Sequence, residues 1–299
     1  MKVNVIEKTI IVKRCILIIK LTLLSCCLFM PLTVVAQEWK LVWSDEFNVD
    51  GKPDESSWSY ENGFVRNREY QWYQKDNANV KGGLLVIEAR KESFPNPNYN
   101  KAGTDWETSR TDVNYTSACI TTAGKREFLY GRFEVRARIP IGKSSWPAIW
   151  TLGKNMPWPS NGEIDIMEFY RINGTPYILA NTAWGTDQPD VANWNTQRIP
   201  LSAFTDKDSE WASKFHVWRM DWDETAIRLY LDDELLNETL LSETNNGSIG
   251  NGTNPFKQPH YILLNLALGQ YGDEPDDNQL PMKYEIDYVR VYQKDNQVQ

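Results

Sequence analysis

The stretch "GEIDIMEFY", residues 162–170, carries three carboxylates, Glu163, Asp165 and Glu168, with apolar residues between them. On a regular strand the side chains alternate between two faces, so Glu163 and Asp165 point together and Glu168 points away. A β-bulge inserts one extra residue and reverses the alternation beyond it. A bulge at Ile166–Met167 would therefore bring all three acids onto one face. The alternative is a solvated acidic strand whose last acid points elsewhere.

Three acids on one face have a chemical consequence. Like charges this close repel, and one carboxyl group must keep its proton to relieve the conflict. A carboxyl group with a raised pKa can act as a general acid near neutral pH. Two glutamates leaning together can bring their carboxyl groups to roughly 5 to 6 Å, which suits a retaining glycosidase with one nucleophile and one proton donor.

The rest of the chain has the pattern of many short β-strands. Residues 131–140 alternate apolar and charged side chains, as expected of a half-buried antiparallel strand, and residues 226–238 predict a hairpin that turns at its paired aspartates. Strands separated by Gly, Pro, Asn and Asp indicate a sandwich or a barrel. The long polar connections 92–114, 185–214 and 242–258 are expected to line a site.

Residues 1–36 are predicted to be a signal peptide. They combine a positively charged start, an apolar run at 21–30 and a small-residue ending at Ala36. The apolar run is too short to span a membrane. An alternative is a lipoprotein signal, with Cys26 or Cys27 as the lipid-attachment site. Both readings predict an exported protein that is secreted, periplasmic or lipid-anchored at a bacterial cell surface.

Residues 37–299 are predicted to form one domain without repeats or a transmembrane segment. Removing the leader, which carries five Lys or Arg and one Glu, changes the formal net charge from -8 to -12. Such an acidic protein is a poor partner for nucleic acid or an anionic membrane. Cys119 is then the last cysteine left, so no internal disulfide can form. We expect a monomer that binds a neutral or cationic partner.

Seven segments from Trp39 to Gln293 occur in an order that closely resembles bacterial family 16 glycoside hydrolases, particularly the laminarinase and β-1,3(4)-glucanase branch. The resemblance implies an all-β, concanavalin A-like jelly-roll sandwich of two curved antiparallel sheets, with a sugar-binding cleft across the concave sheet. The segments are "SDEFN", "GLLVIEARKE", "TSACITTAGKREFLYGRFEVRARIP", "SSWPAIWTLG", "GEIDIMEF", "ILLNLALG" and "IDYVRVYQ".

The resemblance also implies roles for the acids. Glu163 matches the nucleophile, Glu168 the acid/base and Asp165 an auxiliary acid that orients a glutamate and influences the shared protons. Met167 matches the bulged motif of laminarinase-like members, which typical lichenases lack. The implied activity is endo-hydrolysis of a β-glucan by double displacement, on laminarin-type β-1,3-glucan, mixed-linkage β-1,3/1,4-glucan or both. No organic cofactor is required.

Three tryptophans are expected to contact sugar. Trp146 and Trp150 match the strand before the catalytic one, and their spacing of four places them on the same face. Flat aromatic rings suit stacking on sugars, although core packing is the alternative. Trp184 resembles an aromatic residue of the strand after the catalytic one. Ala183 stands where relatives carry His, which weakens the contacts expected there.

Polar residues complete the expected binding site. Asn67, in a segment that resembles the non-reducing side of the cleft, and Arg90 are candidates for hydroxyl recognition or for loop stabilisation. Asn265 lies in an otherwise apolar strand and needs hydrogen-bond partners if it is buried. It is expected to face the cleft or to cap a neighbouring backbone group.

A structural calcium ion is a further expectation. Glu46 and Asp287 match positions that bind calcium on the convex side of related enzymes, and calcium prefers such oxygen ligands. Two side chains are few for a site. A salt bridge to Arg132 or Arg290 is the alternative for these acids.

Other functions fit the sequence less well. A non-catalytic, lectin-like carbohydrate-binding sandwich would predict a damaged acid triplet, whereas all three acids are present. A serine or zinc hydrolase is disfavoured because the chain has two histidines, His216 and His260, outside any motif. Laminarin and mixed-linkage glucan remain open as substrates, with agarose, porphyran and xyloglucan more remote.

Overall fold

The computed structural model describes residues 38–269 and 273–295. The predicted signal peptide and its alternative lipid-attachment cysteines lie outside these residues. From Trp39 onward the chain forms one compact unit. Within the described part, no helix has the length and apolar character needed to cross a membrane.

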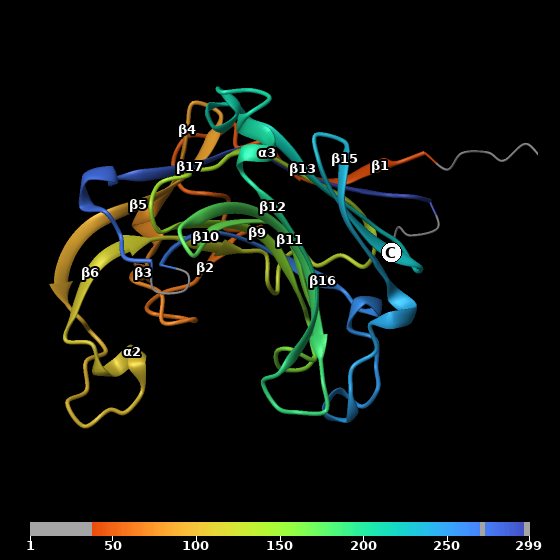
Figure 1. Cartoon of the computed structure of the whole chain (residues 1–299), viewed down its shortest axis with the longest axis horizontal. Coiled ribbons are helices and arrows are strands. Elements are labelled where there is room, and N and C mark those ends of the chain that lie inside the picture. Colours follow the sequence, from red (N-terminus) through yellow and green to blue (C-terminus); the bar gives the residue numbers. More distant parts are fainter. Residues whose placement is uncertain (1–37, 270–272, 296–299) are drawn as a thin grey trace, which may run out of the picture. The chain divides into compact units, whose positions relative to one another are not determined.

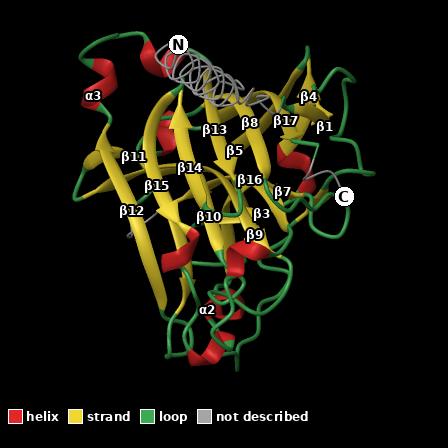
Figure 2. Ribbon diagram, turned by 90° about the vertical axis from the view of Figure 1, so that its right-hand side faces the viewer, coloured by secondary structure: helices red, strands yellow, loops and turns green. Residues whose placement is uncertain are grey.

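Over the described residues, the strands form two sheets. The larger sheet has the order β15-β14-β13-β8-β17-β5-β6-β3, with β1 added beside β17 and β4 beside β5. Strands β13 and β17 are labelled in Figure 1, and Figure 2 shows the long strands β8, β13 and β17 lying together. Its strands are β1 (Lys40–Asp45), β3 (Gln71–Tyr73), β4 (Ala78–Lys81), β5 (Leu84–Pro95), β6 (Asp112–Ser117), β8 (Gly131–Arg138), β13 (His216–Trp222), β14 (Ala226–Leu231), β15 (Glu234–Leu240) and β17 (Met282–Gln293).

The second sheet has the order β12-β11-β10-β9-β16-β7-β2. Figure 1 shows the ribbons of β9, β10, β11 and β12 curving together in the same sense. The strands are β2 (Ser59–Tyr60), β7 (Cys119–Thr121), β9 (Ser145–Gly153), β10 (Glu163–Ile172), β11 (Thr175–Gly185), β12 (Ala192–Pro200) and β16 (His260–Leu268).

Helical segments are short. The α-helical turns are α2 (Trp106–Ser109) and α3 (Ser202–Thr205). The described 3-10 turns are η1 (Lys75–Asn77), η2 (Trp211–Ser213), η3 (Leu241–Glu243), η4 (Ser248–Gly250), η5 (Pro255–Lys257) and η7 (Asp277–Gln279).

The predicted all-β sandwich is confirmed. Phe133, Val135 and Ala137 of β8 are buried while the residues between them are more exposed, so this strand lays one apolar face on the core. The predicted hairpin is also present, and Asp232 and Asp233 turn with positive φ between β14 and β15. One detail differs from a purely antiparallel arrangement, because β3 and β6 pair in parallel. The long excursion between them supplies the crossover that a parallel pair requires.

Candidate active site

The acidic strand β10 contains the predicted bulge. Asp165 lies opposite Asn181 of β11, yet Glu168 lies opposite Leu179, so three steps on β10 match two on β11. The register against β9 slips at the same place. Ile166 and Met167 are both buried in the core between the sheets. The extra residue therefore returns Glu168 to the face of the first two acids.

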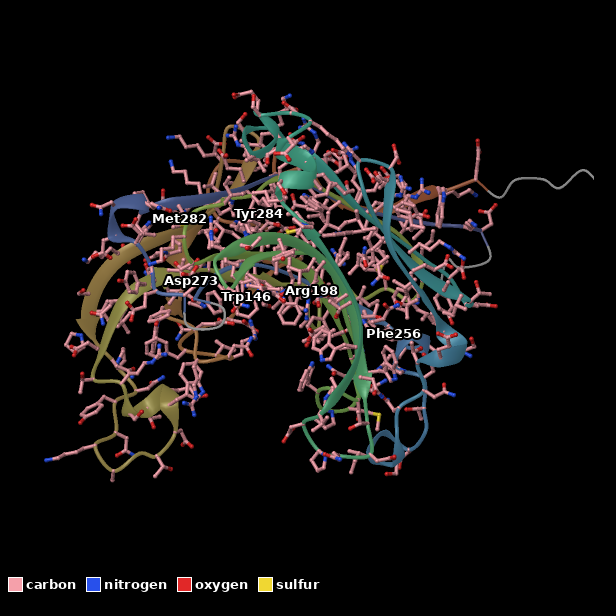
Figure 3. All side chains as sticks on the ribbon, viewed as in Figure 1. Trp146, Arg198, Phe256, Asp273, Met282 and Tyr284 are labelled. Atoms are coloured by element: carbon pink, nitrogen blue, oxygen red, sulfur yellow. The ribbon has the colours of Figure 1, made fainter. Side chains whose placement is uncertain are left out.

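These acids lie in a pocket of about 660 Å³ on the outer face of the smaller sheet. Its walls come from the loop before β3, the loop between β9 and β10, and strands β9, β10, β11, β12 and β16. Figure 3 shows Trp146 and Arg198, two of the lining residues, beneath the curved ribbons of this sheet. The lining residues are Arg66, Asn67, Glu69, Trp146, Ala148, Trp150, Leu152, Trp158, Glu163, Asp165, Glu168, Tyr170, Asn181, Trp194, Thr196, Arg198 and Asn265.

Each acid of the triplet accepts hydrogen bonds from neighbouring strands or loops. Trp146 Nε1 donates to Glu168 Oε1 over 2.8 Å, and Asn181 Nδ2 donates to Glu168 Oε2 over 2.8 Å. The same amide donates to Asp165 Oδ2 over 3.1 Å. Trp158 Nε1 donates to Glu163 Oε2 over 3.0 Å. The carboxyl groups are therefore held in fixed positions by three different elements.

The electrostatics of the triplet favour retention of protons. Burial, helped by the charge of Glu168, raises the pKa of Glu163 to about 7. Burial also raises the pKa of Glu168 to about 7, against the lowering effect of its hydrogen bonds from Trp146 and Asn181. The pKa of Asp165 lies well above its usual value because of burial and the two glutamate charges. The three acids form one coupled group that still holds protons at neutral pH.

Trp146, Trp150 and Asn265 all reach the pocket, as the spacing of the tryptophans predicts. The two rings are only 7% and 8% exposed, so they form pocket walls with limited free surface. Trp150 Nε1 donates to Asn265 Oδ1 over 2.7 Å, and Asn265 Nδ2 donates to the hydroxyl of Tyr73 over 3.1 Å. Asn265 thus satisfies its polar groups within the wall of the pocket.

Asn67 also lines the pocket, in an exposed turn with a φ of 56°. Its amide donates to Glu69 Oε1 over 3.2 Å, and Gln71 Nε2 donates to Glu69 Oε2 over 2.6 Å. Burial raises the pKa of Glu69. This segment therefore adds a fourth buried carboxyl group to the pocket, beside the three of β10.

Comparison with known proteins identifies the family. The family described as "Glycosyl hydrolases family 16" matches residues 66–290. The chain belongs to glycosyl hydrolase family 16. This match confirms the resemblance read from the ordered motifs, including the assignment as a glycoside hydrolase. The curved two-sheet fold is also the one expected of a family 16 enzyme.

Individual relatives support the same assignment. The beta-glucanase of Rhodothermus marinus is 37% identical over 282 residues, covering 86% of each chain. The solved laminarinase of the same organism is 33% identical, with a TM-score of 0.69 over 87% of this chain and 99% of that one. A structure from work on endo-acting O-glycanases of human gut microbiota that initiate mucin breakdown is 36% identical. Its TM-score is 0.76, over 87% of this chain and 92% of that one.

One predicted tryptophan of this family 16 protein faces the wrong way for sugar stacking. Trp184 is partly buried and packs against the core between the sheets. Its neighbour Thr182 shares that face and hydrogen-bonds to Thr239 of the other sheet over 2.9 Å. Ala183 points toward the pocket instead, and across from it lies Trp194 of β12, which is 47% exposed. The prediction for Trp184 is wrong, and the ring that lines the pocket in this region is that of Trp194.

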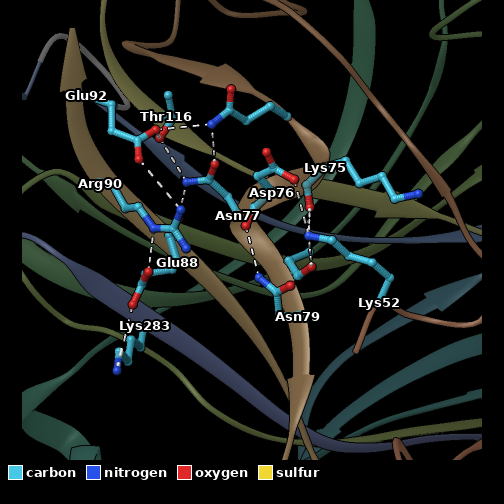
Figure 4. Close-up of polar contacts among 12 residues, drawn as sticks. Lys52, Lys75, Asp76, Asn77, Asn79, Glu88, Arg90, Glu92, Thr116 and Lys283 are labelled. Atoms are coloured by element: carbon cyan, nitrogen blue, oxygen red, sulfur yellow. Dashed lines mark hydrogen bonds and ion pairs between the residues drawn. The ribbon is translucent and has the colours of Figure 1, made fainter. Parts of the chain in front are cut away.

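Arg90 is likewise outside the site. It lies on β5 of the larger sheet and pairs with Glu88 and Glu92. Figure 4 shows this network, in which Lys283 also pairs with Glu88 and Thr116 donates to Glu92. The guanidinium is neutralised within its own sheet, so the prediction that it binds substrate is corrected to a structural role.

The two candidate calcium ligands are each paired with an arginine. Arg290 donates to both carboxylate oxygens of Glu46, through Nε and Nη2, each over 2.8 Å. Asp287 pairs with Arg136. No group of three or more His, Cys, Asp or Glu residues that could hold a metal occurs in residues 38–269 and 273–295. The salt-bridge alternative describes Glu46 correctly, whereas Asp287 pairs with an arginine other than the two expected.

Several pocket residues escaped the sequence analysis. Trp158 lies between two prolines, five residues before the first acid, and its ring is 39% exposed. An aromatic residue in a turn-rich segment directly ahead of the acidic strand is a signal for this position. Two more, Arg66 and Glu69, lie beside Asn67 in the segment before β3. The remaining ones lie on β10, β11 and β12 and carry no local signal; they are Tyr170, Asn181, Trp194, Thr196 and Arg198.

Proposed function

We propose that the protein is a retaining endo-β-glucanase that cleaves internal bonds of β-1,3-glucan or mixed-linkage β-1,3/1,4-glucan. The observation that carries this proposal is the bulge in β10, since it gathers three acids with raised pKa values on one pocket floor. The beta-glucanase and laminarinase relatives support the substrate class. A non-catalytic binding sandwich has no need for such a costly cluster of buried acids.

In the proposed mechanism, Glu163 attacks the anomeric carbon and the glycosidic C–O bond breaks. Glu168 donates its proton to the departing oxygen, leaving a glycosyl ester on Glu163. Glu168 then removes a proton from water, whose oxygen attacks the anomeric carbon and releases Glu163. The sugar therefore keeps its anomeric configuration after two displacements.

Asp165 acts as the auxiliary acid of this mechanism. Its raised pKa keeps a proton on the buried carboxyl group, and hydrogen bonding to Asp165 lowers the pKa of both Glu163 and Glu168. A protonated Asp165 can thus stabilise Glu163 as the anion that attacks. No organic cofactor enters any step.

The shape of the pocket supports cleavage within a polymer. Its lining extends over β12, β11, β10, β9 and β16, which at about 4.8 Å per strand span roughly 19 Å between the outer backbones. Such a width suits several sugar residues. The exposed rings of Trp158 and Trp194, which both line the pocket, offer stacking surfaces for sugars. We also infer that the protein is exported and acts as a monomer.

Endo-hydrolysis of a mucin O-glycan is the second candidate. The O-glycanase structure has a TM-score of 0.76 against 0.69 for the laminarinase. Initial rates and product sizes on laminarin, mixed-linkage glucan, pure β-1,4-glucan and mucin O-glycans discriminate the two. We expect short oligomers from laminarin or mixed-linkage glucan. Turnover of mucin O-glycans alone would replace the first proposal with the second.

A further inference from the structure

The part of the pocket formed by β11 and β12 has an unusual charge pattern. Residues 175–185 and 192–200 contain a single charged side chain, Arg198. It lines the pocket together with Trp194 and Thr196 of the same strand, and Figure 3 shows it beneath the curved sheet. The part of the pocket formed by β11 and β12 is therefore positively charged, in an otherwise acidic pocket.

Arg198 is exposed, and within residues 38–269 and 273–295 its side chain has no hydrogen-bond or ion-pair partner. The other arginine of the pocket differs in this respect. Arg66 pairs with Glu61 and lies over the ring of Trp150, 5.1 Å from its centroid. The charge of Arg66 is thus used within the protein, whereas the charge of Arg198 is free for a ligand.

The strand register gives the position of this free charge relative to the acids. Arg198 lies opposite Leu179, and Leu179 lies opposite Glu168. Two strand spacings separate the backbones of Arg198 and Glu168, which is about 10 Å. The residue between them is apolar, so no carboxylate competes for the guanidinium. A glycan crossing the strands would place a sugar adjacent to the cleaved bond, or the next one, beside Arg198.

We propose that Arg198 binds an anionic substituent, a sulfate ester or a carboxylate, on a sugar held over β11 and β12. This inference rests on the proposed function, since it requires a glycan in the pocket. A guanidinium is always charged and binds planar or tetrahedral oxyanions through paired N–H donors. Recognition of a neutral hydroxyl group requires neither the charge nor the paired donors. The net charge of -8 repels polyanions in general. Recognition would therefore be confined to a substituent at this position.

The test uses matched substrates that differ only in charge. One pair is β-glucan oligosaccharides with and without partial oxidation of the primary hydroxyl to a carboxylate. The other pair is keratan sulfate and its chemically desulfated form, which covers a galactose-containing backbone. Mass spectrometry of the products locates the charged residue relative to the cut, and initial rates give kcat/KM for each member.

Three variants complete the design. Arg198→Gln removes the charge, Arg198→Lys keeps it without the paired donors, and Arg68→Gln removes an exposed arginine that does not line the pocket. We expect the wild type to prefer the charged member by about five-fold at low salt, with less preference as the ionic strength rises. The charged residue should be enriched at one fixed position from the cut. Arg198→Gln should abolish both effects, and Arg68→Gln should preserve them.

The outcomes separate the two proposals. Equal or slower cleavage of the charged member by the wild type, or a preference that survives in Arg198→Gln, overturns the role of Arg198. An equal loss of kcat/KM on neutral and charged members in Arg198→Gln does the same, because it shows hydroxyl binding. Failure to cleave neutral glucan while the keratan pair is cleaved overturns the glucanase proposal alone. Failure on every backbone overturns both.

Discussion

Removal of the Asn181 side chain amide should move the basic limb of the pH–rate profile. This amide donates to Glu168 Oε2 over 2.8 Å and to Asp165 Oδ2 over 3.1 Å, and it lowers the pKa of both acids. In Asn181→Ala the ionised form of Glu168 loses one donor. Its pKa must therefore rise from the value of about 7. Since the general acid works in its protonated form, activity should persist to higher pH.

The size of the shift follows from the hydrogen bond. A bond to a charged group contributes about 1.5–3 kcal/mol, and about 1.4 kcal/mol corresponds to one pKa unit. Complete loss of the hydrogen bond from Asn181 would raise the pKa of Glu168 by about one to two units. Water that enters the space left by the amide restores part of the interaction. We therefore expect the pKa of Glu168 to rise by about one unit. Because the three acids titrate together, the basic limb of the pH–rate profile reports an apparent pKa of the whole triplet.

The assay is kcat/KM against pH on a cleavable oligosaccharide, with folding checked by circular dichroism. Asn195→Ala is the matched control, because Asn195 lies on β12 and donates to Glu238 O and Thr239 Oγ1 instead of the acids. Its profile should match that of the wild type. Asn181→Thr, which keeps a hydroxyl donor, should shift less than Asn181→Ala. A folded, active Asn181→Ala enzyme whose basic limb stays in place, or moves to lower pH, would refute the reasoning.

Three further predictions follow from the site. Glu163→Gln and Glu168→Gln should each lose about three or more powers of ten in kcat, and near-normal turnover by either folded variant would contradict its assigned role. Trp194→Ala should raise KM with little change in melting temperature. Trp184→Ala should lower the melting temperature, because it leaves a cavity in the core. Equal effects of the two variants on KM would show that both rings bind sugar. EDTA should leave the melting temperature unchanged, because arginines neutralise the candidate calcium ligands, and a drop that calcium reverses would show a metal site.

Patterns within one strand could be read directly from the sequence. Three acids at unequal spacing, with Met167 between the second and third, indicated a bulge because alternation on a strand has a strict period of two. The even spacing of Trp146 and Trp150 placed both rings on one face for the same reason. These inferences use only local backbone geometry, and the structure bears them out.

Errors arose where a residue's role depended on a neighbour far along the chain. The face of Trp184 follows from the register of β11 against β10 and β12, which no local pattern specifies. The partner of Glu46 is Arg290, 244 residues away, and such a pair forms only after the strands are placed side by side. Arg90 has ion-pair partners two residues away on its own strand, Glu88 and Glu92, but the assignment of β5 to the larger sheet is what removes it from the pocket.

The sequence alone therefore determined the all-β fold, the family and the acidic strand with its bulge, since each is written in local periodicity and ordered motifs. Tertiary structure decided which other residues meet those acids. The amide of Asn181 comes from β11, the ring of Trp158 from the loop before β10, and the ring of Trp194 and the free charge of Arg198 from β12. They line one pocket because strand pairing brings segments that are distant in the sequence side by side, and that is a property of the folded chain.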